Sequence, residues 1–138
     1  MSFRIRPEGQ DDSNGIRAVH LAAFPTPAEA DLVKMLHEDH DSEISLVAEG
    51  GAQVVGHVLL SRMQVEGNGR AYRALGLGPV AVLPALQKQG IGSALIDEAM
   101  RLAEARGEEI VFLVGEPDYY RRFGFSTEAA APFASPYA

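Results

Sequence analysis

The sequence predicts one mixed α/β (α+β) domain over residues 1–138, in which helices flank a central, mostly antiparallel sheet. Two observations support this class. Several short segments alternate apolar and polar residues, as half-buried strands do, whereas others space apolar residues three and four positions apart, as amphipathic helices do. Glycine-containing turns join three consecutive strands, and a strand–helix–strand crossover follows them. A chain of 138 residues is long enough to bury the core of such a domain.

The first part of the chain contains a strand and two helices. Residues 3–6 alternate and stop at Pro7, which predicts a short strand. Polar residues at positions 11–13 can cap the first helix. Its apolar face carries Ile16, Val19, His20 and Ala23. The second helix begins with a capping threonine, a proline and a glutamate within residues 26–29, and it ends within residues 37–41.

The remaining elements follow from apolar runs bounded by glycine, proline and charged residues. In chain order they are a hairpin of residues 44–49 and 53–62 about Gly50-Gly51, a second turn at 65–70, a strand at 72–83, a helix from Ile91 that stops at Gly107, a strand at 109–114 and a short helix at 118–123. Gly76, Gly78 and Pro79 lie inside the 72–83 strand and predict a bulge or a departure from its neighbour.

Composition excludes several classes of protein. The chain has no cysteine, so it forms no disulfide, thiolate metal site or cysteine nucleophile. Its formal net charge of −7 argues against broad binding to nucleic acid or to an anionic membrane surface. No apolar run approaches the roughly 18 residues that span a bilayer, and the N-terminus lacks the apolar region of a signal peptide. We therefore expect a cytoplasmic protein without a membrane partner.

Residues 80–95 are the most informative segment of the chain. An apolar strand, a proline break and a glycine-containing loop lead into a helix. The N–H groups of a first helical turn lack intrahelical partners, and glycine lets a phosphate approach the backbone, so the segment predicts a phosphorylated ligand. Two other glycine motifs fit less well. Neither Gly90 nor Gly92 is followed by the lysine of a P-loop, and the G-x-G-x-x-A pattern at residues 76–81 does not open a helix.

Two motifs resemble those of the GNAT superfamily of acetyl-CoA-dependent N-acetyltransferases. Val82-Leu83-Pro84 followed by Gln87-Lys88-Gln89-Gly90-Ile91-Gly92 resembles the family's Val-x-Pro and [Gln/Arg]-x-x-Gly-x-[Gly/Ala] signature. Tyr120-Arg121-Arg122-Phe123-Gly124-Phe125 resembles its Tyr-x-x-x-Gly-Phe element. The resemblance covers nearly the whole chain in element order and is strongest from Leu75 to Phe125, where it is similar to a bacterial branch of largely unassigned acceptor. It implies a GNAT fold and acetyl-CoA as the cosubstrate.

The resemblance also implies roles for particular residues. The CoA pyrophosphate would bind backbone amides of Gln87, Lys88, Gln89, Gly90, Ile91, Gly92 and Ser93. Backbone groups of Val80 and Val82 would pair with the pantetheine arm, and an amide near Val82 would polarise the thioester carbonyl. Tyr120 would protonate the CoA thiolate, since a phenol, with an ordinary pKa of about 10, is close to a thiol in acidity. The expected reaction is direct attack of a primary amine, on a small molecule or a peptide, in a ternary complex.

The general base is open at this level of evidence. Many family members place a glutamate on the strand before the loop, whereas residues 74–80 contain no carboxylate. Water, His57 and Glu116 are the alternatives. Two features favour a second interpretation, a non-catalytic acyl-CoA-binding sensor or partner module. They are the absence of a carboxylate on this strand and the short segment that follows Phe125. A nucleotide-binding domain that uses the 76–81 motif is a third.

Three other segments carry expectations of their own. Residues 28–43 hold six carboxylates against Lys34, which suits a cationic acceptor such as a polyamine, an aminoglycoside or lysine, but also an ordinary acidic surface. His37 and His40 have a spacing that suits a metal, yet no third ligand is defined, so we expect a solvated helix end and no metal. Residues 126–138 are too few for the two strands that usually finish the family's domain, and an uncovered edge would favour a homodimer.

Overall fold

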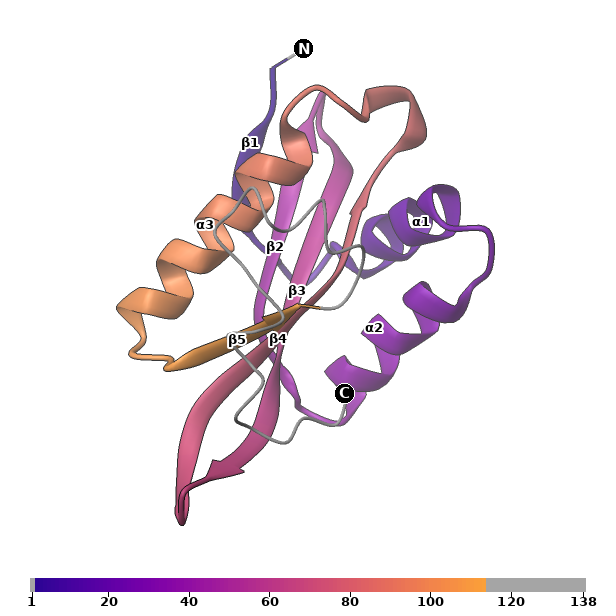
Figure 1. Cartoon of the computed structure of the whole chain (residues 1–138). Helices are drawn as coiled ribbons and strands as arrows, with labels where there is room; N and C mark the ends of the chain where they lie inside the picture. The colour runs from indigo at the N-terminus through magenta and orange to yellow at the C-terminus, as the bar shows by residue number, and fades with distance from the viewer. Residues whose placement is uncertain (1, 114–138) are drawn as a thin grey trace.

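The computed structural model describes residues 2–113, apart from the side chains of Gln64 and Leu113. In chain order the elements are β1 (Arg4–Pro7), α1 (Ser13–Ala23), α2 (Ala28–Glu38), β2 (Ser42–Gly50), β3 (Gln53–Gly67), β4 (Arg70–Val82), the 3₁₀ turn η1 (Pro84–Leu86), α3 (Ile91–Ala105) and β5 (Ile110–Leu113) (Figure 1). This order confirms the prediction as far as the fifth strand. The helix expected at 118–123 lies outside the described residues. No described helix is long and apolar enough to cross a membrane.

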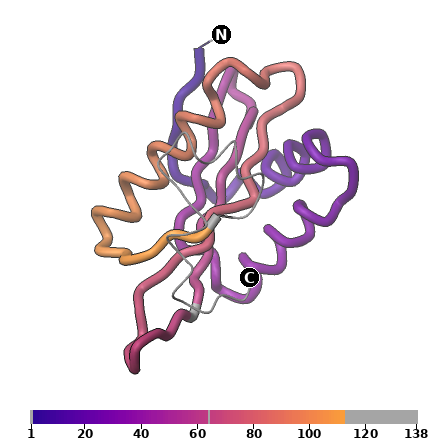
Figure 2. Tube along the Cα trace, in the orientation of Figure 1, coloured from indigo at the N-terminus to yellow at the C-terminus, as the bar shows by residue number. Residues whose placement is uncertain are grey.

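The described strands form one five-stranded sheet in the order β1-β2-β3-β4-β5. Neighbours from β1 to β4 are antiparallel, whereas β5 is parallel to β4. This confirms a mixed, mostly antiparallel sheet with one crossover through α3. Helix α3 lies against one face of the sheet, and α1 and α2 lie against the other (Figure 1 and Figure 2).

The main core fills the space between α3 and the sheet. Its fully buried members from four elements include Leu46, Leu60, Leu75, Leu77, Ile91, Leu95 and Ile96. Adjacent residues of a strand point to opposite faces, so Gly56 of β3 lies against α3 while His57 contacts α1. Burial of one such aliphatic side chain is worth roughly 1.5–3 kcal/mol. The core therefore holds α3 firmly on the sheet, together with the loop that precedes it.

The β3–β4 ladder is interrupted close to the end of β4. Leu60 pairs with Leu77 and Val58 pairs with Val80, so that two residues of β4 oppose Leu59 alone. The two β4 residues between these pairs are Gly78 and Pro79. Proline has no N–H to donate, and a bulge accommodates the additional residue. The bulge predicted from glycine and proline inside this strand is confirmed.

Two local boundaries differ from the sequence-based expectations. The second turn consists of Asn68 and Gly69 alone, with φ values of 53° and 76°, because the strands on either side continue up to it. Two successive positive φ values give a turn whose twist matches that of a hairpin, so residues 65–67 stay in the ladder. Pro27 occupies the N-cap position of α2, whereas we expected it inside the helix. The hydroxyl of Thr26 still accepts the N–H of Ala28 at 3.3 Å.

Candidate functional site

The loop between β4 and α3 is fastened to the sheet at two points. The N–H of Leu83 donates to the carbonyl of Val55 at 2.9 Å. The side-chain amide of Gln87 donates to the carbonyl of Val82 at 3.0 Å. These bonds lie on either side of η1, so the loop follows a defined path even though residues 87–90 are exposed.

Gly90 turns the chain into α3 and leaves open space beside the helix start. Its φ is 90°, in the left-handed region that favours glycine, and a Cβ at this position would meet no atom within 4 Å. The N–H of Ala94 donates to the carbonyl of Gly90 at 3.0 Å, so the N–H groups of Ile91 and Gly92 precede the α-helical hydrogen-bond ladder. The first turn of α3 carries no acidic side chain. The helix dipole and these N–H groups together favour an anion here.

Gly56 determines how closely α3 approaches the sheet. A Cβ at Gly56 would lie 3.1 Å from side-chain carbons of both Ile91 and Leu95, and 3.2 Å from the carbonyl oxygen of Ala81. These distances are shorter than ordinary van der Waals contact, so glycine allows the first turn of α3 to rest on β3 beside β4. The sequence predicts a strand at Gly56, but the contact of this glycine with α3 depends on tertiary packing and is not visible in the sequence pattern.

The outer edge of β4 is available near the end of the strand. The β5 strand pairs with β4 from Ala74 to Leu77. Val80 and Val82 pair with β3 on their other side. Among residues 2–113, no strand covers the outer edge of these two valines, and an extended polar ligand can form backbone hydrogen bonds at such an edge.

The structure brings the predicted loop residues together at one end of the sheet. Gln87, Lys88, Gln89 and Gly90 are exposed, Gly92 and Ser93 are half-buried, and Ile91 is buried in the main core. The other predicted site residues, Tyr120 and Glu116, lie outside the described residues.

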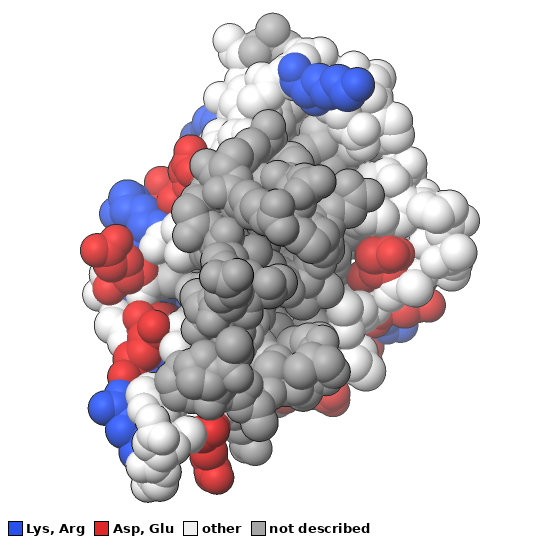
Figure 3. All heavy atoms as spheres, viewed as in Figure 1, with Lys and Arg blue, Asp and Glu red and all other residues white. Residues whose placement is uncertain are grey.

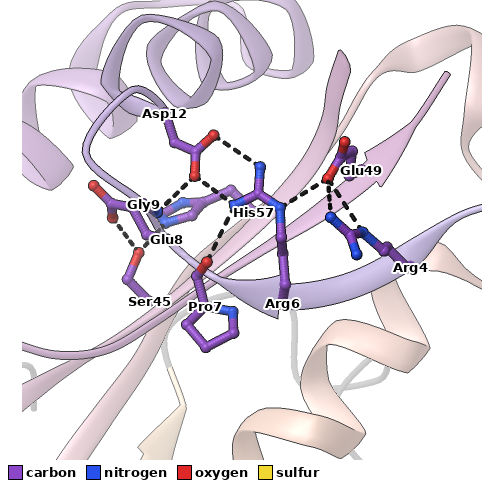
Figure 4. A network of polar contacts seen from close by, with 9 residues as sticks. All are labelled: Arg4, Arg6, Pro7, Glu8, Gly9, Asp12, Ser45, Glu49 and His57. Carbon is purple, nitrogen blue, oxygen red and sulfur yellow. Dashed lines mark hydrogen bonds and ion pairs between the residues drawn. The ribbon is translucent and has the colours of Figure 1, made fainter. Parts of the chain in front are cut away.

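His57, an expected base candidate, is fully buried in a chain of hydrogen bonds. Its Nδ1 lies 2.8 Å from Nε2 of His20, and its Nε2 lies 2.8 Å from Oγ of Ser45. Ser45 Oγ in turn lies 2.5 Å from Oε1 of Glu8 (Figure 4). Sequence reasoning missed this arrangement, because three of its members come from elements distant in the chain. The available signal was a pair of histidines on otherwise apolar faces.

Both histidines are held in the neutral form. Burial is the largest cause that lowers the pKa of His57 to about 3, the nearby His20 lowers it further, and the carboxylate of Asp12 acts in the opposite direction. Burial lowers the pKa of His20 to about 4. His57 has no exposed surface and is hydrogen-bonded through both ring nitrogens, so it lies in the core rather than at a surface that an acceptor reaches directly.

The segment that carries Glu8 is fastened by a charged network. Arg6 Nη1 lies 2.7 Å from Oδ2 of Asp12, and the N–H of Gly9 donates to the same oxygen at 2.6 Å (Figure 4). The hydrogen bond from Arg6 and then that from Gly9 lower the pKa of Asp12 to about 2. Arg6 Nε also lies 2.8 Å from Oε1 of Glu49. The Asp12 side chain is therefore engaged here. Asp12 occupies the N-cap position of α1, but its side chain makes no capping hydrogen bond, in contrast to one of the caps that we expected.

The acidic segment 28–43 is largely a solvated, ion-paired surface. Its carboxylates Asp31, Glu38 and Glu43 pair with Arg17, with Lys34, and with Arg62 and Arg106, respectively. On the face shown in Figure 3, described acidic and basic side chains are interspersed. Helix α2 ends at Glu38, and His40 follows it with a φ of 60°, so His37 and His40 do not share a helix face.

A mixed sheet with one crossover, and a glycine-containing loop that leads into a helix beside an open strand edge, are the features of an acyltransferase-type domain. The family model described as an acetyltransferase (GNAT) domain matches residues 4–127. The chain belongs to the GNAT acetyltransferase family, whose cosubstrate is acetyl-CoA.

Relatives support this membership. The chain is 34% identical to the uncharacterized N-acetyltransferase YjhQ of Escherichia coli K12 over 125 residues, which cover 89% of this chain and 69% of that protein. A GNAT family acetyltransferase from Brucella melitensis, solved in complex with acetyl-CoA, is 37% identical with a TM-score of 0.83 and covers 97% of this chain and 86% of its own. YhbS from Escherichia coli, solved in complex with CoA, is 34% identical with a TM-score of 0.84 and covers 92% and 70%.

Proposed function

We propose that this protein transfers the acetyl group of acetyl-CoA to a primary amine, which attacks the thioester directly in a ternary complex. The observation that carries the proposal is the start of α3, where a left-handed glycine with open space beside it, Gly90, follows an exposed lysine, Lys88. This arrangement fits a pyrophosphate. Solved relatives that hold acetyl-CoA or CoA support the same assignment.

In this proposal the cosubstrate is held mainly by the backbone. Amides between Gln87 and Ser93 would bind the pyrophosphate, and the outer edge of Val80 and Val82 would pair with the pantetheine arm. The amine nitrogen forms a bond to the carbonyl carbon, the carbon–sulfur bond breaks, and the thiolate leaves. Tyr120 is proposed as the acid that protonates the thiolate, and the nitrogen, positively charged after attack, loses one proton to a base to give the neutral amide.

A second candidate is an acyl-CoA-binding module that does not catalyse transfer. It is favoured by one specific observation: β4, the strand that leads into the loop, contains no carboxylate. The same loop would then bind acyl-CoA as a signal. Both candidates bind CoA, but only the transferase releases CoA thiol in the presence of an amine.

Calorimetry and a thiol-release assay separate these functions. We expect acetyl-CoA and CoA to bind and NAD not to bind, and we expect release of CoA thiol with at least one member of an amine panel. Gln87→Ala should weaken CoA binding severalfold, since it removes the bond to Val82, whereas the matched change Gln89→Ala alters an exposed side chain. Tyr120→Phe should reduce kcat while CoA affinity stays nearly constant. CoA binding without thiol release would support the non-catalytic module, and no CoA binding would overturn both candidates.

A further inference from the structure

The last peptide of β4 turns its carbonyl toward the open edge of the strand. The N–H of Leu83 donates to the carbonyl of Val55 in β3 at 2.9 Å. The Val82–Leu83 peptide is trans, and in a trans peptide the N–H and the C=O point in opposite directions. The carbonyl of Val82 therefore points away from β3. It faces the outer side of β4, which no strand covers at this position within residues 2–113.

The preceding peptides of β4 continue this alternation. The carbonyl oxygen of Ala81 lies 3.2 Å from the position that a Cβ of Gly56 would take in β3, so it faces inward. The N–H of Val82 belongs to the same peptide as that oxygen and therefore faces outward. Backbone groups two residues apart on a strand face the same side, so the carbonyl of Val80 also faces outward. This part of the edge presents two carbonyls and one N–H between them.

Gln87 occupies one of these outward groups. Its side-chain amide donates to the carbonyl of Val82 at 3.0 Å. Gln87 lies in an exposed part of the loop, where water could solvate its amide, yet the side chain reaches back to the strand edge. Between Val80 and Val82 the edge is left with one available acceptor, the carbonyl of Val80, and one available donor, the N–H of Val82.

A pantetheine arm has groups that match this edge in more than one position. It carries two secondary amides, each with one N–H and one C=O, joined by flexible methylene groups. If both outward carbonyls were available, an N–H of the arm could pair with either of them. The two positions differ by two residues, or about 7 Å at roughly 3.4 Å per residue. A misplacement of only 1 Å in a reacting group can cost on the order of 100-fold in rate, so the register of the arm matters for transfer.

We propose that Gln87 is a positioning residue that fixes the register of the pantetheine arm on β4. Its side-chain amide occupies the carbonyl of Val82, so that an N–H of the arm pairs with the carbonyl of Val80 and a carbonyl of the arm accepts from the N–H of Val82. This inference rests on the proposed function. It adds a role for the Gln87 side chain that is separate from the backbone amides proposed to hold the pyrophosphate.

This role predicts different effects on binding and on transfer. Loss of the Gln87 amide frees the carbonyl of Val82 and lets the arm pair in a second register. The backbone amides of the loop still hold the pyrophosphate. A change at Gln87 therefore alters the position of the acetyl group more than the strength of CoA binding.

Carbon-13 NMR of the backbone carbonyls tests the register without turnover. Valine labelled at its carbonyl carbon reports on Val80 and Val82, because a carbonyl that accepts a new hydrogen bond shifts downfield. In the wild type, CoA should shift the Val80 signal downfield and leave that of Val82 in place. In Gln87→Met, which removes the donor but keeps the length of the side chain, CoA should shift both signals. A CoA-induced downfield shift at Val82 in the wild type would overturn the inference, as would a shift at Val80 alone in the variant.

Three variants test the same role in turnover. At saturating acetyl-CoA, Gln87→Met should lower kcat at least about tenfold, whereas the dissociation constant for CoA should rise only severalfold. Gln87→Arg keeps a side chain that only donates hydrogen bonds, and it should restore kcat to within about threefold of the wild type. Gln53→Met makes the same exchange at an exposed glutamine of β3 outside the proposed site, and its kcat should equal that of the wild type.

The outcomes separate this inference from the proposed function. If the wild type releases CoA thiol with an amine and Gln87→Met stays within about twofold of its kcat, the inference is wrong and the function stands. Failure of Gln87→Arg to restore kcat would also overturn the inference alone. If the wild type binds CoA without releasing thiol, the carbonyl shifts decide. If calorimetry shows no CoA binding, the proposed function fails and the inference fails with it.

Discussion

His20 and His57 meet edge to face in the core, with ring centroids 5.1 Å apart and an interplanar angle of 79°. Neither side chain has exposed surface. Two imidazoles in this position are compatible with folding only while both are neutral, because a buried positive charge would lose its hydration and repel its neighbour. The histidine pair therefore links folding stability to pH.

We expect the free energy of unfolding to fall as the pH drops from 7 toward 4. The pKa of His20 is lowered to about 4 and that of His57 to about 3, both from an ordinary value of 6.5. Between the folded and unfolded pKa values the unfolded chain binds more protons, so stability increases with pH in this window. The loss near pH 5 should be on the order of a few kcal/mol. Urea denaturation at a series of pH values measures it.

A matched pair of variants identifies the groups responsible. His57→Gln should make the pH dependence between 7 and 4 shallower, since one buried titrating group is removed. His37→Gln, the same change at an exposed position of α2, is the control for the substitution itself. Equal slopes in the wild type and His57→Gln would contradict the assignment.

Asp12→Asn should destabilise the fold by about 1–3 kcal/mol, because it removes the charge that Arg6 and the Gly9 N–H satisfy. The pKa of the Asp12 carboxyl is lowered to about 2 from 3.8. This stabilisation is therefore present above pH 4 and is lost as the pH falls toward 2, which is below the pH range in which the unfolded chain's histidines gain protons. Asp31→Asn, in the exposed pair with Arg17, should change stability by less than about 0.5 kcal/mol. Equal losses for the two variants, measured by urea denaturation, would argue against the network.

Sequence reasoning predicted those features that depend on local pattern. The order of strands and helices along the chain, α3 and the loop from Gln87 to Gly92 follow from alternation, helical spacing and glycine placement, and all are present in the structure. The Glu8–Ser45–His57–His20 chain was not predictable in this way, because it depends on strand register and on the loop after β1. The close approach at Gly56 depends likewise on where α3 lies across the sheet. The role of Tyr120 stays a prediction.

Glu108→Gln should cost about 1–3 kcal/mol of stability. The Glu108 side chain has no exposed surface and accepts from Arg62 at 2.6 Å and from Arg73 at 2.9 Å. Hydrogen bonding to Arg62 is the largest cause that lowers its pKa. Removing its charge leaves both guanidinium groups without their shared partner, although the partial exposure of both arginines reduces the cost. Glu98→Gln, in a surface pair with Arg101, is the control and should have little effect in thermal unfolding.

Gly56→Ala should weaken binding of CoA as well as stability. The added methyl group would lie 3.1 Å from carbons of Ile91 and Leu95, so the first turn of α3 must shift away from β3. Such overpacking costs about 1–3 kcal/mol, and the shift displaces the N–H groups proposed to hold the pyrophosphate. Calorimetry should show CoA affinity reduced by at least about tenfold, the equivalent of about 1.4 kcal/mol.

Gly15→Ala provides the comparison that separates displacement of the loop from a general loss of stability. A Cβ at Gly15 would lie 3.1 Å from two side-chain carbons of Val54, the same degree of overlap, but in α1 on the opposite face of the sheet. Because alanine favours a helix over glycine by about 1 kcal/mol, its net cost should be smaller than that of Gly56→Ala. CoA affinity of Gly15→Ala should equal that of the wild type at a temperature where both are folded. If the two variants lose affinity equally, the packing of Gly56 against α3 does not control the ligand site.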